Sequence, residues 1–118
     1  MSTRKITITV QNNTGCILSL SHDTLEHGKW LTSPSENIAD KASDIWEAGN
    51  RDGALIGTTG TVKYTGGDAT FKIDFDHPYG SSDTVVKHSA TGNFDSKLDN
   101  DHLQHHDASC TITFYKLS

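Results

Sequence analysis

Imidazole and carboxylate side chains gather in the segment from Asp99 to Asp107, and both groups are common ligands of zinc. The histidines are His102, His105 and His106, at spacings of three and one. This is not the H-E-x-x-H pattern of a zinc protease, and the aspartates lack the spacing of an EF-hand loop. A metal site and a solvated polar loop both remain possible; we favour the polar loop and expect no metal ligand here.

Motifs for enzymatic catalysis are missing elsewhere in the chain. There is no G-x-S-x-G nucleophile turn, and neither cysteine stands in a recognisable frame with a histidine. The segment GTTGT, residues 57–61, lacks the spacing of a phosphate-binding loop. We therefore expect a protein that is not an enzyme and needs no cofactor. A hydrolase that uses the His/Asp segment is an alternative.

Two aromatic side chains occupy positions from which they could bind a ligand. Trp30 follows a Gly-Lys pair, and Tyr79 stands between Pro78 and Gly80 at the end of an alternating run. A turn needs the proline and the glycine but not an aromatic residue between them. Tryptophan and tyrosine combine an apolar body with a polar tip, which suits a membrane interface and the face of a sugar equally well. Trp46, inside an alternating run, is instead expected in the core.

The elements that carry these residues alternate apolar and polar side chains with a period of two, which predicts β-strands. Clear examples are KITITVQ, CILSLSH, GTTGTVKY, ATFKIDFD and CTITFYKL, with turn residues between the runs. About eight short strands at this spacing favour a sandwich or a barrel, and the short connections favour antiparallel pairing. We expect one all-β domain over residues 1–118, an antiparallel β-sandwich, with one long irregular stretch at residues 89–107.

The net charge of −5 and the absence of a basic run argue against a nucleic-acid partner. They also argue against simple electrostatic attraction to anionic lipid. No stretch approaches the ~18 apolar residues of a membrane span, and the N-terminal residues lack the apolar segment of a signal peptide. We expect a soluble chain that is cytoplasmic or is released without a signal peptide.

The two cysteines, Cys16 and Cys110, are too few for a disulfide scaffold. Each lies in an apolar alternating run, so we expect both thiols to be reduced and buried. A disulfide between the first and last hairpins is the alternative, which the spacing does not decide.

Three segments together resemble the aegerolysins, small β-proteins of fungi and bacteria. They are GKW at Gly28–Trp30, GNRDGALIGTTGTVKY at Gly49–Tyr64 and DHPYGSSDT at Asp76–Thr84. The family shows a Trp-Gly-Lys segment, then a Gly-Arg-Ser-Asp stretch leading into Gly-Thr-Thr-Gly, and later an Asp-Cys-Pro-Trp-Gly-Ser turn. Their order and spacing agree with this chain from Lys5 to Thr84, and the C-terminal strand agrees in character.

The resemblance implies an actinoporin-like β-sandwich that binds membrane lipid and is not an enzyme. Aegerolysins recognise particular lipids, such as sphingomyelin with cholesterol or ceramide phosphoethanolamine. Several act with a larger perforin-like partner to form pores, and some are called haemolysins. The chain is therefore expected to act at the surface of sphingolipid-containing bilayers, with the lipid-binding part of a pore-forming cytolysin, a toxin, as one role.

The resemblance also places the lipid-facing end of the sandwich at the Pro-aromatic-Gly turn. Tyr79 would be an interfacial anchor there, and Ser81 and Ser82 would offer hydroxyls to a lipid headgroup. The Gly-Lys-Trp segment would flank the same end. The candidate residues for binding lipid or sugar are therefore Lys29, Trp30, His77, Tyr79, Ser81 and Ser82.

The chain departs from the family pattern at several of these positions. His77 replaces the cysteine before the proline, Tyr79 replaces a tryptophan, His27 replaces the tryptophan before Gly-Lys, and Ile56 replaces an acidic residue. A carbohydrate-binding lectin or haemagglutinin on the same fold is therefore the alternative function. A concave pocket lined by aspartate or asparagine beneath one aromatic ring would favour it. Acidification through pH ~6.5 is expected to charge His27 and His77 near the binding face.

Overall fold

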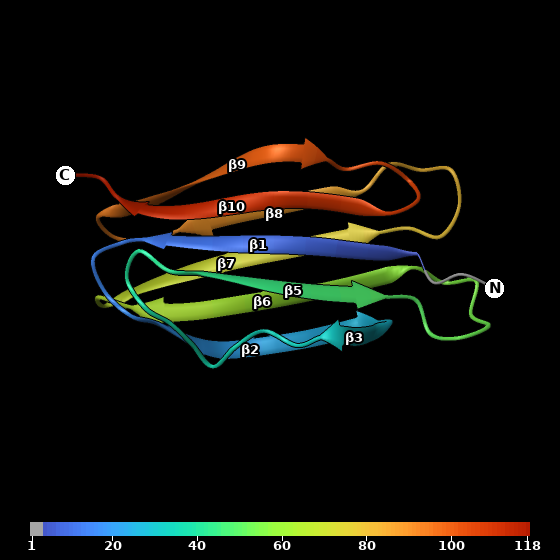
Figure 1. Ribbon diagram of the computed structural model, residues 1–118, viewed down its shortest axis with the longest axis horizontal. Coiled ribbons are helices and arrows are strands. Elements are labelled where there is room, and N and C mark those ends of the chain that lie inside the picture. The colour runs from blue at the N-terminus through green and yellow to red at the C-terminus, as the bar shows by residue number, and fades with distance from the viewer. Residues whose placement is uncertain (1–3) are drawn as a thin grey trace.

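The computed structural model describes residues 4–118, which form two five-stranded β-sheets packed face to face (Figure 1). The strands are β1 (Lys5–Asn13), β2 (Leu18–His27), β3 (Lys29–Thr32), β4 (Asn37–Ile38), β5 (Ser43–Gly49), β6 (Thr58–Gly66), β7 (Ala69–His77), β8 (Val85–Ala90), β9 (Phe94–His102) and β10 (Ala108–Lys116). One sheet has the order β3-β5-β1-β10-β9 and the other β4-β2-β6-β7-β8. The predicted all-β sandwich is confirmed. In residues 4–118 no helix has the length and apolar composition to cross a bilayer.

The pairing is antiparallel throughout both sheets, with one exception. Strands β1 and β10, the first and last of the chain, run parallel at the centre of their sheet, with Ile8 opposite Cys110. The remaining neighbours pair antiparallel, as the short connections predicted. Strands β1 and β10 are thereby hydrogen-bonded to a neighbouring strand on both sides.

Alternation along each strand builds the core between the two sheets. In β1, Ile6, Ile8 and Val10 are fully buried, because every second side chain of a strand points to the same face. The same pattern in β7 buries the apolar side chains and leaves Lys72 and Asp74 on the outer face. The period-two signal in the sequence therefore corresponds to one buried face per strand.

Two buried aromatic side chains in this core form a hydrogen bond with each other through their polar groups. Trp46 and Tyr64 are fully buried, and the indole N–H of Trp46 donates to the Tyr64 hydroxyl over 3.1 Å. Burial is the main reason why the pKa of Tyr64 is raised above its ordinary value. The prediction that Trp46 is a core residue is confirmed.

The two cysteines differ in burial, which corrects part of the prediction made for them. Neither is in a disulfide. Cys110 in β10 is only 3% exposed, and burial raises the pKa of its thiol to about 12. Cys16 is half-buried, because it lies in the turn between β1 and β2 and not on the inner face of a strand.

The segment 89–107, predicted to be irregular, contains the whole of strand β9. Strand β9 lies within it and pairs antiparallel with β10 at the edge of its sheet. Phe94, Ser96 and Leu98 are half-buried, whereas Asp95 and Lys97 between them are exposed. The prediction was wrong because the polar Ser96 lies between Phe94 and Leu98 on the inner face and interrupts the apolar alternation. The polar and charged residues at the exposed positions are a common device that protects an edge strand from pairing with another chain.

Candidate functional site

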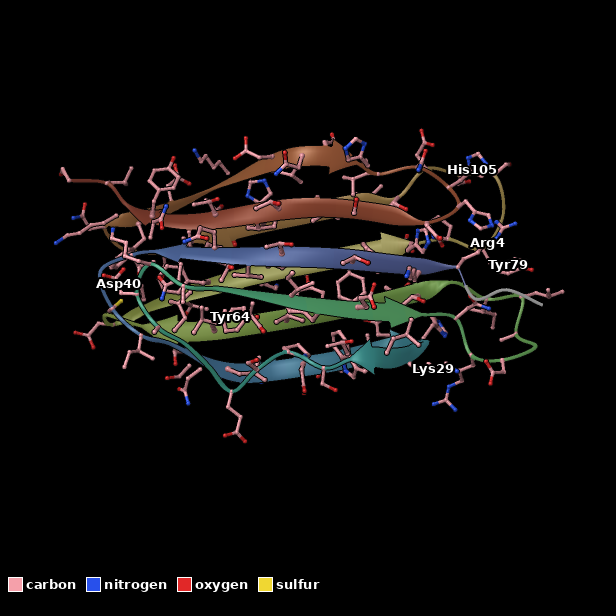
Figure 2. The ribbon with its side chains drawn as sticks, in the orientation of Figure 1. Arg4, Lys29, Asp40, Tyr64, Tyr79 and His105 are labelled. Atoms are coloured by element: carbon pink, nitrogen blue, oxygen red, sulfur yellow. The ribbon has the colours of Figure 1, made fainter. Side chains whose placement is uncertain are left out.

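Three loops and the start of β1 meet at one end of the sandwich, which we call the loop end. The loops are residues 50–57 between β5 and β6, 78–84 between β7 and β8, and 103–107 between β9 and β10 (Figure 1). Figure 2 shows Arg4, Lys29, Tyr79 and His105 at this end, whereas Asp40 lies at the opposite end. The structure thus brings together the two predicted regions around Lys29 and Tyr79, which are far apart in the sequence.

The side chain of Arg4 holds the Tyr79 turn in place. Its guanidinium carbon lies 4.4 Å from the centroid of the Tyr79 ring, within the range of a cation–π interaction. Its Nη1 donates to the carbonyl of Gly80 over 2.9 Å. A second constraint comes from Gly57, where a Cβ atom would lie 2.1 Å from the carbonyl oxygen of His77. The half-buried Tyr79 ring is therefore presented by a braced turn.

The remaining predicted residues of this turn and of β3 differ in exposure. Ser81 and Ser82 are exposed, as a contact with a headgroup requires. Lys29 forms an ion pair with Asp52, with 2.9 Å between Nζ and Oδ1. This pair ties β3 to the loop 50–57 and neutralises part of the positive charge that was expected to face a ligand. Because both side chains are accessible, the pair contributes at most about 1 kcal/mol to stability.

Trp30 packs against the core, whereas the sequence analysis expected its ring to be available to a ligand. Its ring packs edge-on against Trp46 with centroids 5.6 Å apart, and against Phe75 with centroids 6.3 Å apart. Its indole N–H donates to the carbonyl of Asp23 over 3.1 Å. The side chain is half-buried, so only part of the ring is left for a ligand.

His77 does not lie where the sequence-based hypothesis placed it. The side chain is 1% exposed, and its Nδ1 is hydrogen-bonded to the hydroxyl of Thr84. Burial, above all other causes, lowers the pKa of His77 below its ordinary value. The ring therefore cannot touch a bound headgroup directly, and it is not charged together with exposed histidines on acidification.

An apolar pair that the sequence analysis did not single out lies in the loop 50–57, after its turn at residues 51–54. Leu55 is 70% exposed and Ile56 is 58% exposed. Asn50 orders this loop, because its amide donates to the carbonyls of Arg51 and Ala54, each over 3.3 Å. Two adjacent large apolar residues amid turn residues, in GNRDGALIG, were the signal that could have identified the pair.

A small hollow separates this loop from the end of β2. Its volume is about 130 Å³, and it is lined by Leu25, Glu26, His27, Gly28, Arg51, Ala54 and Ile56. Arg51 and Glu26 place opposite charges on its wall. The hollow can thus receive a small group that carries both a negative and a positive charge, beside the exposed apolar pair.

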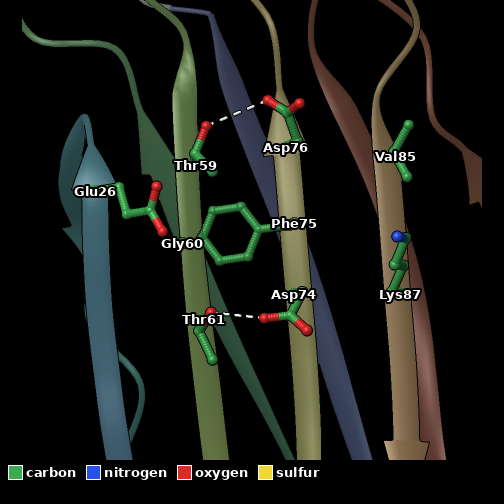
Figure 3. A pocket seen from close by; sticks show the side chains of 9 residues that line it. All are labelled: Glu26, Thr59, Gly60, Thr61, Asp74, Phe75, Asp76, Val85 and Lys87. Carbon is green, nitrogen blue, oxygen red and sulfur yellow. Dashed lines mark hydrogen bonds between the residues drawn. The ribbon is translucent and has the colours of Figure 1, made fainter.

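A second hollow lies on the outer face of the sheet that contains β6 and β7 (Figure 3). It has a volume of about 290 Å³, and Thr59 and Thr61 hydrogen-bond there to Asp76 and Asp74 over 3.2 and 2.6 Å. Phe75 lies at its floor but is only 2% exposed. The carboxylates could bond to sugar hydroxyls, whereas the ring offers almost no face for stacking.

The histidines of the segment 99–107 do not gather around a common point. Across residues 4–118, no three side chains of histidine, cysteine, aspartate or glutamate are arranged to hold a metal ion. His105 and His106 lie exposed in the loop 103–107, and His106 lies 3.5 Å from the carboxylate of its neighbour Asp107. In the described structure this segment is a polar strand end and loop.

Comparison with known proteins identifies relatives by fold and not by sequence. No protein-family model matches the chain, and no curated protein matches it. The lipid binding protein Nakanori superposes with a TM-score of 0.88 at 12% identity, over 98% of this chain and 73% of that chain. RahU, in complex with a TRIS molecule, gives 0.80 at 17% identity over 98% and 96% of the two chains. IP-1A from Alcaligenes faecalis gives 0.74 at 19% identity over 98% and 92%. The chain shares its β-sandwich fold with these proteins.

Proposed function

We propose that this protein is an aegerolysin-like, non-enzymatic protein that binds membrane lipid through its loop end. The observation that carries the proposal is the exposed pair Leu55 and Ile56 in an ordered loop of the loop end. Large apolar side chains grouped at one end of a soluble fold are typical of a surface that is covered in use. The fold shared with the lipid binding protein Nakanori supports the same function.

The arrangement around the pair suits the interface of a bilayer. Leu55 and Ile56 would enter the acyl region, and Tyr79 would lie at the headgroup level, where tyrosine is enriched in membrane proteins. Arg51 would contact the phosphate of a headgroup, and Glu26 in the same hollow would contact an amine. Such a hollow favours zwitterionic lipids, in agreement with the sphingolipids that the resemblance implies.

The apolar pair is large enough to dominate the affinity. Fully burying a leucine or isoleucine side chain stabilises by about 1.5–3 kcal/mol. Because the two side chains are 70% and 58% exposed, both have most of this area left to bury. We expect the pair to contribute about 2–4 kcal/mol, a factor of about 30 to 1000 in affinity. A binding mode of this kind weakens little with added salt.

The test is sedimentation with vesicles of sphingomyelin and cholesterol, of ceramide phosphoethanolamine, and of phosphatidylcholine alone. The double variant Leu55→Ser/Ile56→Ser should lose at least about thirtyfold in affinity. The matched control is Ile17→Ser/Leu117→Ser, which removes two side chains that are 60% and 51% exposed at the opposite end. Wild-type binding by the loop-end variant, or equal loss in both variants, would show that the loop end is not the lipid surface.

Binding of sugar in the hollow of Figure 3 is the second candidate function. The observation in its favour is the pair of carboxylates, Asp74 and Asp76, on a concave surface. A glycan array with wild type and Asp74→Asn/Asp76→Asn tests it. Saturable binding of one glycan class that the variant loses, together with no sedimentation on any vesicle, would replace the lipid proposal by the lectin.

A larger pore-forming partner and an action at membrane surfaces without a signal peptide belong to the same proposal. Both are supported by the resemblance of the three motif segments to the aegerolysins. Release of a dye from vesicles by the protein alone, compared with release after adding a perforin-like protein, tests the partner. Release by the protein alone would show that it needs none.

A further inference from the structure

A buried histidine joins two loops of the loop end that have no covalent link. His77, the last residue of β7, is 1% exposed, and its Nδ1 is hydrogen-bonded to the hydroxyl of Thr84 at the end of the loop 78–84. The same hydroxyl donates to the carbonyl of Gln104 over 2.8 Å. The loops 78–84 and 103–107 are therefore connected through one imidazole and one hydroxyl.

The hydrogen bonds fix the protonation state of the ring. The Thr84 hydroxyl has one proton, which it gives to Gln104, so it must accept a proton from His77. The neutral ring therefore carries its proton on Nδ1, and Nε2 keeps a lone pair. Nε2 is buried and has no hydrogen-bond partner within residues 4–118. A proton added to the ring would sit on this atom, which is buried and makes no hydrogen bond to residues 4–118 in the closed arrangement.

Charged and titratable groups around the ring act in both directions. Asp107 favours the charged ring by its carboxylate, and the backbone of His106 favours it by a hydrogen-bond interaction. Arg4 and a charged His106 side chain oppose it. Burial opposes it most strongly, so the pKa of His77 lies below its ordinary value of 6.5. Arg4 matters twice, because the same guanidinium also holds the loop 78–84 through Gly80 and Tyr79.

We propose that His77 is a proton-operated latch, which fastens the loops 78–84 and 103–107 while neutral and releases them when it is charged. Protonation places a cation in a buried site, where the His106 backbone and the Asp107 carboxylate offset only part of the cost of burial. Swinging the ring outward into water, with the loss of the Thr84 bond, removes this cost. The latch is a property of the fold and does not depend on what the loop end binds.

The direction of the pH effect follows from the lowered pKa. Above pH 6.5 the ring is neutral in the closed and in the opened form, and the latch holds with its full stability. As the pH falls through 6.5, the opened form takes up a proton first, so the closed form loses stability. The loss continues down to the lowered pKa of the closed form. Each unit of lowering shifts the ratio of opened to closed form about tenfold.

The experiment is an NMR titration of the full chain between about pH 8 and about pH 5, the range in which histidines titrate. It follows the ring signals of all histidines and the amide signals of both loops. We expect the two loops to respond with the midpoint of His77, below 6.5. His105 and His106 lie in the loop 103–107 and add their own response there, so the decisive signal is the part with the midpoint of His77. Loop signals without such a part, in either loop, would overturn the proposal.

Three variants separate the latch from general effects of acid. His77→Asn keeps a donor near the position of Nδ1 but cannot titrate, so the part of the loop response that has the midpoint of His77 should disappear, whatever His105 and His106 contribute within their own loop. His27→Asn removes an exposed histidine at the same end and should leave the response intact. If His77→Asn does not fold, Thr84→Val decides: the ring remains, and the loop 103–107 should no longer follow it. The proposal is contradicted if the loop signals of His77→Asn keep the midpoint that His77 has in the wild type. It is also contradicted if the loop 103–107 of Thr84→Val still responds with the midpoint of His77.

Discussion

Replacing Trp30 by alanine tests whether this side chain stabilises the packing of the two sheets or serves mainly to bind a ligand. The ring makes edge-on contacts with Trp46 and Phe75, and its N–H donates to the carbonyl of Asp23. It closes the core at the end where β3 joins its sheet. We expect Trp30→Ala to destabilise the fold before it affects any binding.

The size of the effect follows from these contacts. Each aromatic pair is worth about 0.5–1.5 kcal/mol beyond its buried area, and a typical hydrogen bond is worth about 0.5–1.5 kcal/mol. Two pairs and one hydrogen bond give about 2–4 kcal/mol for Trp30→Ala. This is near the lower end of the ~3–5 kcal/mol lost when a fully buried tryptophan is replaced by alanine, as expected for a half-buried ring.

The assay is unfolding in urea, followed by the fluorescence of Trp46, which is the second of the two tryptophans of the chain. With an m-value of about 2 kcal/mol/M, the midpoint should fall by about 1–2 M. Leu31→Ala is the matched control, because Leu31 is the next residue of the same strand but 41% exposed. Its free energy of unfolding should change by no more than about 0.5 kcal/mol.

The result that refutes the packing argument is a Trp30→Ala variant with the urea midpoint of the wild type. If that variant also binds vesicles more weakly, Trp30 is an interfacial anchor, as the sequence-based hypothesis held. Trp30→Phe refines the comparison, because it keeps an aromatic ring against Trp46 but removes the N–H. We expect it to restore most of the midpoint.

Two further predictions concern the core. Gly60→Ala should lower the free energy of unfolding by about 1–3 kcal/mol, because its Cβ would lie 2.8 Å from a ring carbon of Phe75, while the exposed control Thr65→Ala should be near neutral; equal urea midpoints for the two variants would contradict it. A thiol reagent at about pH 8 should label the half-buried Cys16 first and Cys110 only as the chain unfolds, because burial raises the pKa of the Cys110 thiol to about 12. Equal labelling rates in the native protein would contradict this, and equal rates in urea serve as the control.

The parts of the fold that could be predicted are those in which one strand carries its own signal. The runs KITITVQ and ATFKIDFD have a buried face and an outer face, and they form β1 and β7. Strand β9 has the same two faces, but the polar Ser96 separates Phe94 from Leu98 on its inner face, so the apolar alternation that marks β1 and β7 is missing. The parallel pairing of β1 with β10 could not be predicted, because a period of two gives the face of a strand but not its neighbour.

The same distinction applies to the loop end. An aromatic residue between proline and glycine predicted an exposed turn, and Tyr79 lies in one at the loop end. That Arg4 stacks on this ring, and that His77 is buried, depends on segments from distant parts of the chain meeting at one end. No pattern within one segment of the sequence predicts contacts between distant segments. Leu55 and Ile56 did have a local signal, because they are two adjacent large apolar residues among turn residues. This signal indicates an exposed apolar pair only if the surrounding residues form a loop.

The loop end combines exposed apolar side chains with several hydrogen bonds that connect its loops to one another and to the start of β1. Asn50 accepts from the backbone N–H of Arg4 over 2.8 Å and also orders the loop that carries Leu55 and Ile56. Arg4 also donates a hydrogen bond to the carbonyl of Gly80 in the loop 78–84. His77 is hydrogen-bonded to Thr84, whose hydroxyl donates to the carbonyl of Gln104 in the loop 103–107. Loops that are ordered before binding lose little conformational entropy when they bind, so more of the apolar contact energy remains as affinity. A few well-placed polar contacts inside the protein can therefore determine how strongly an apolar surface outside it binds.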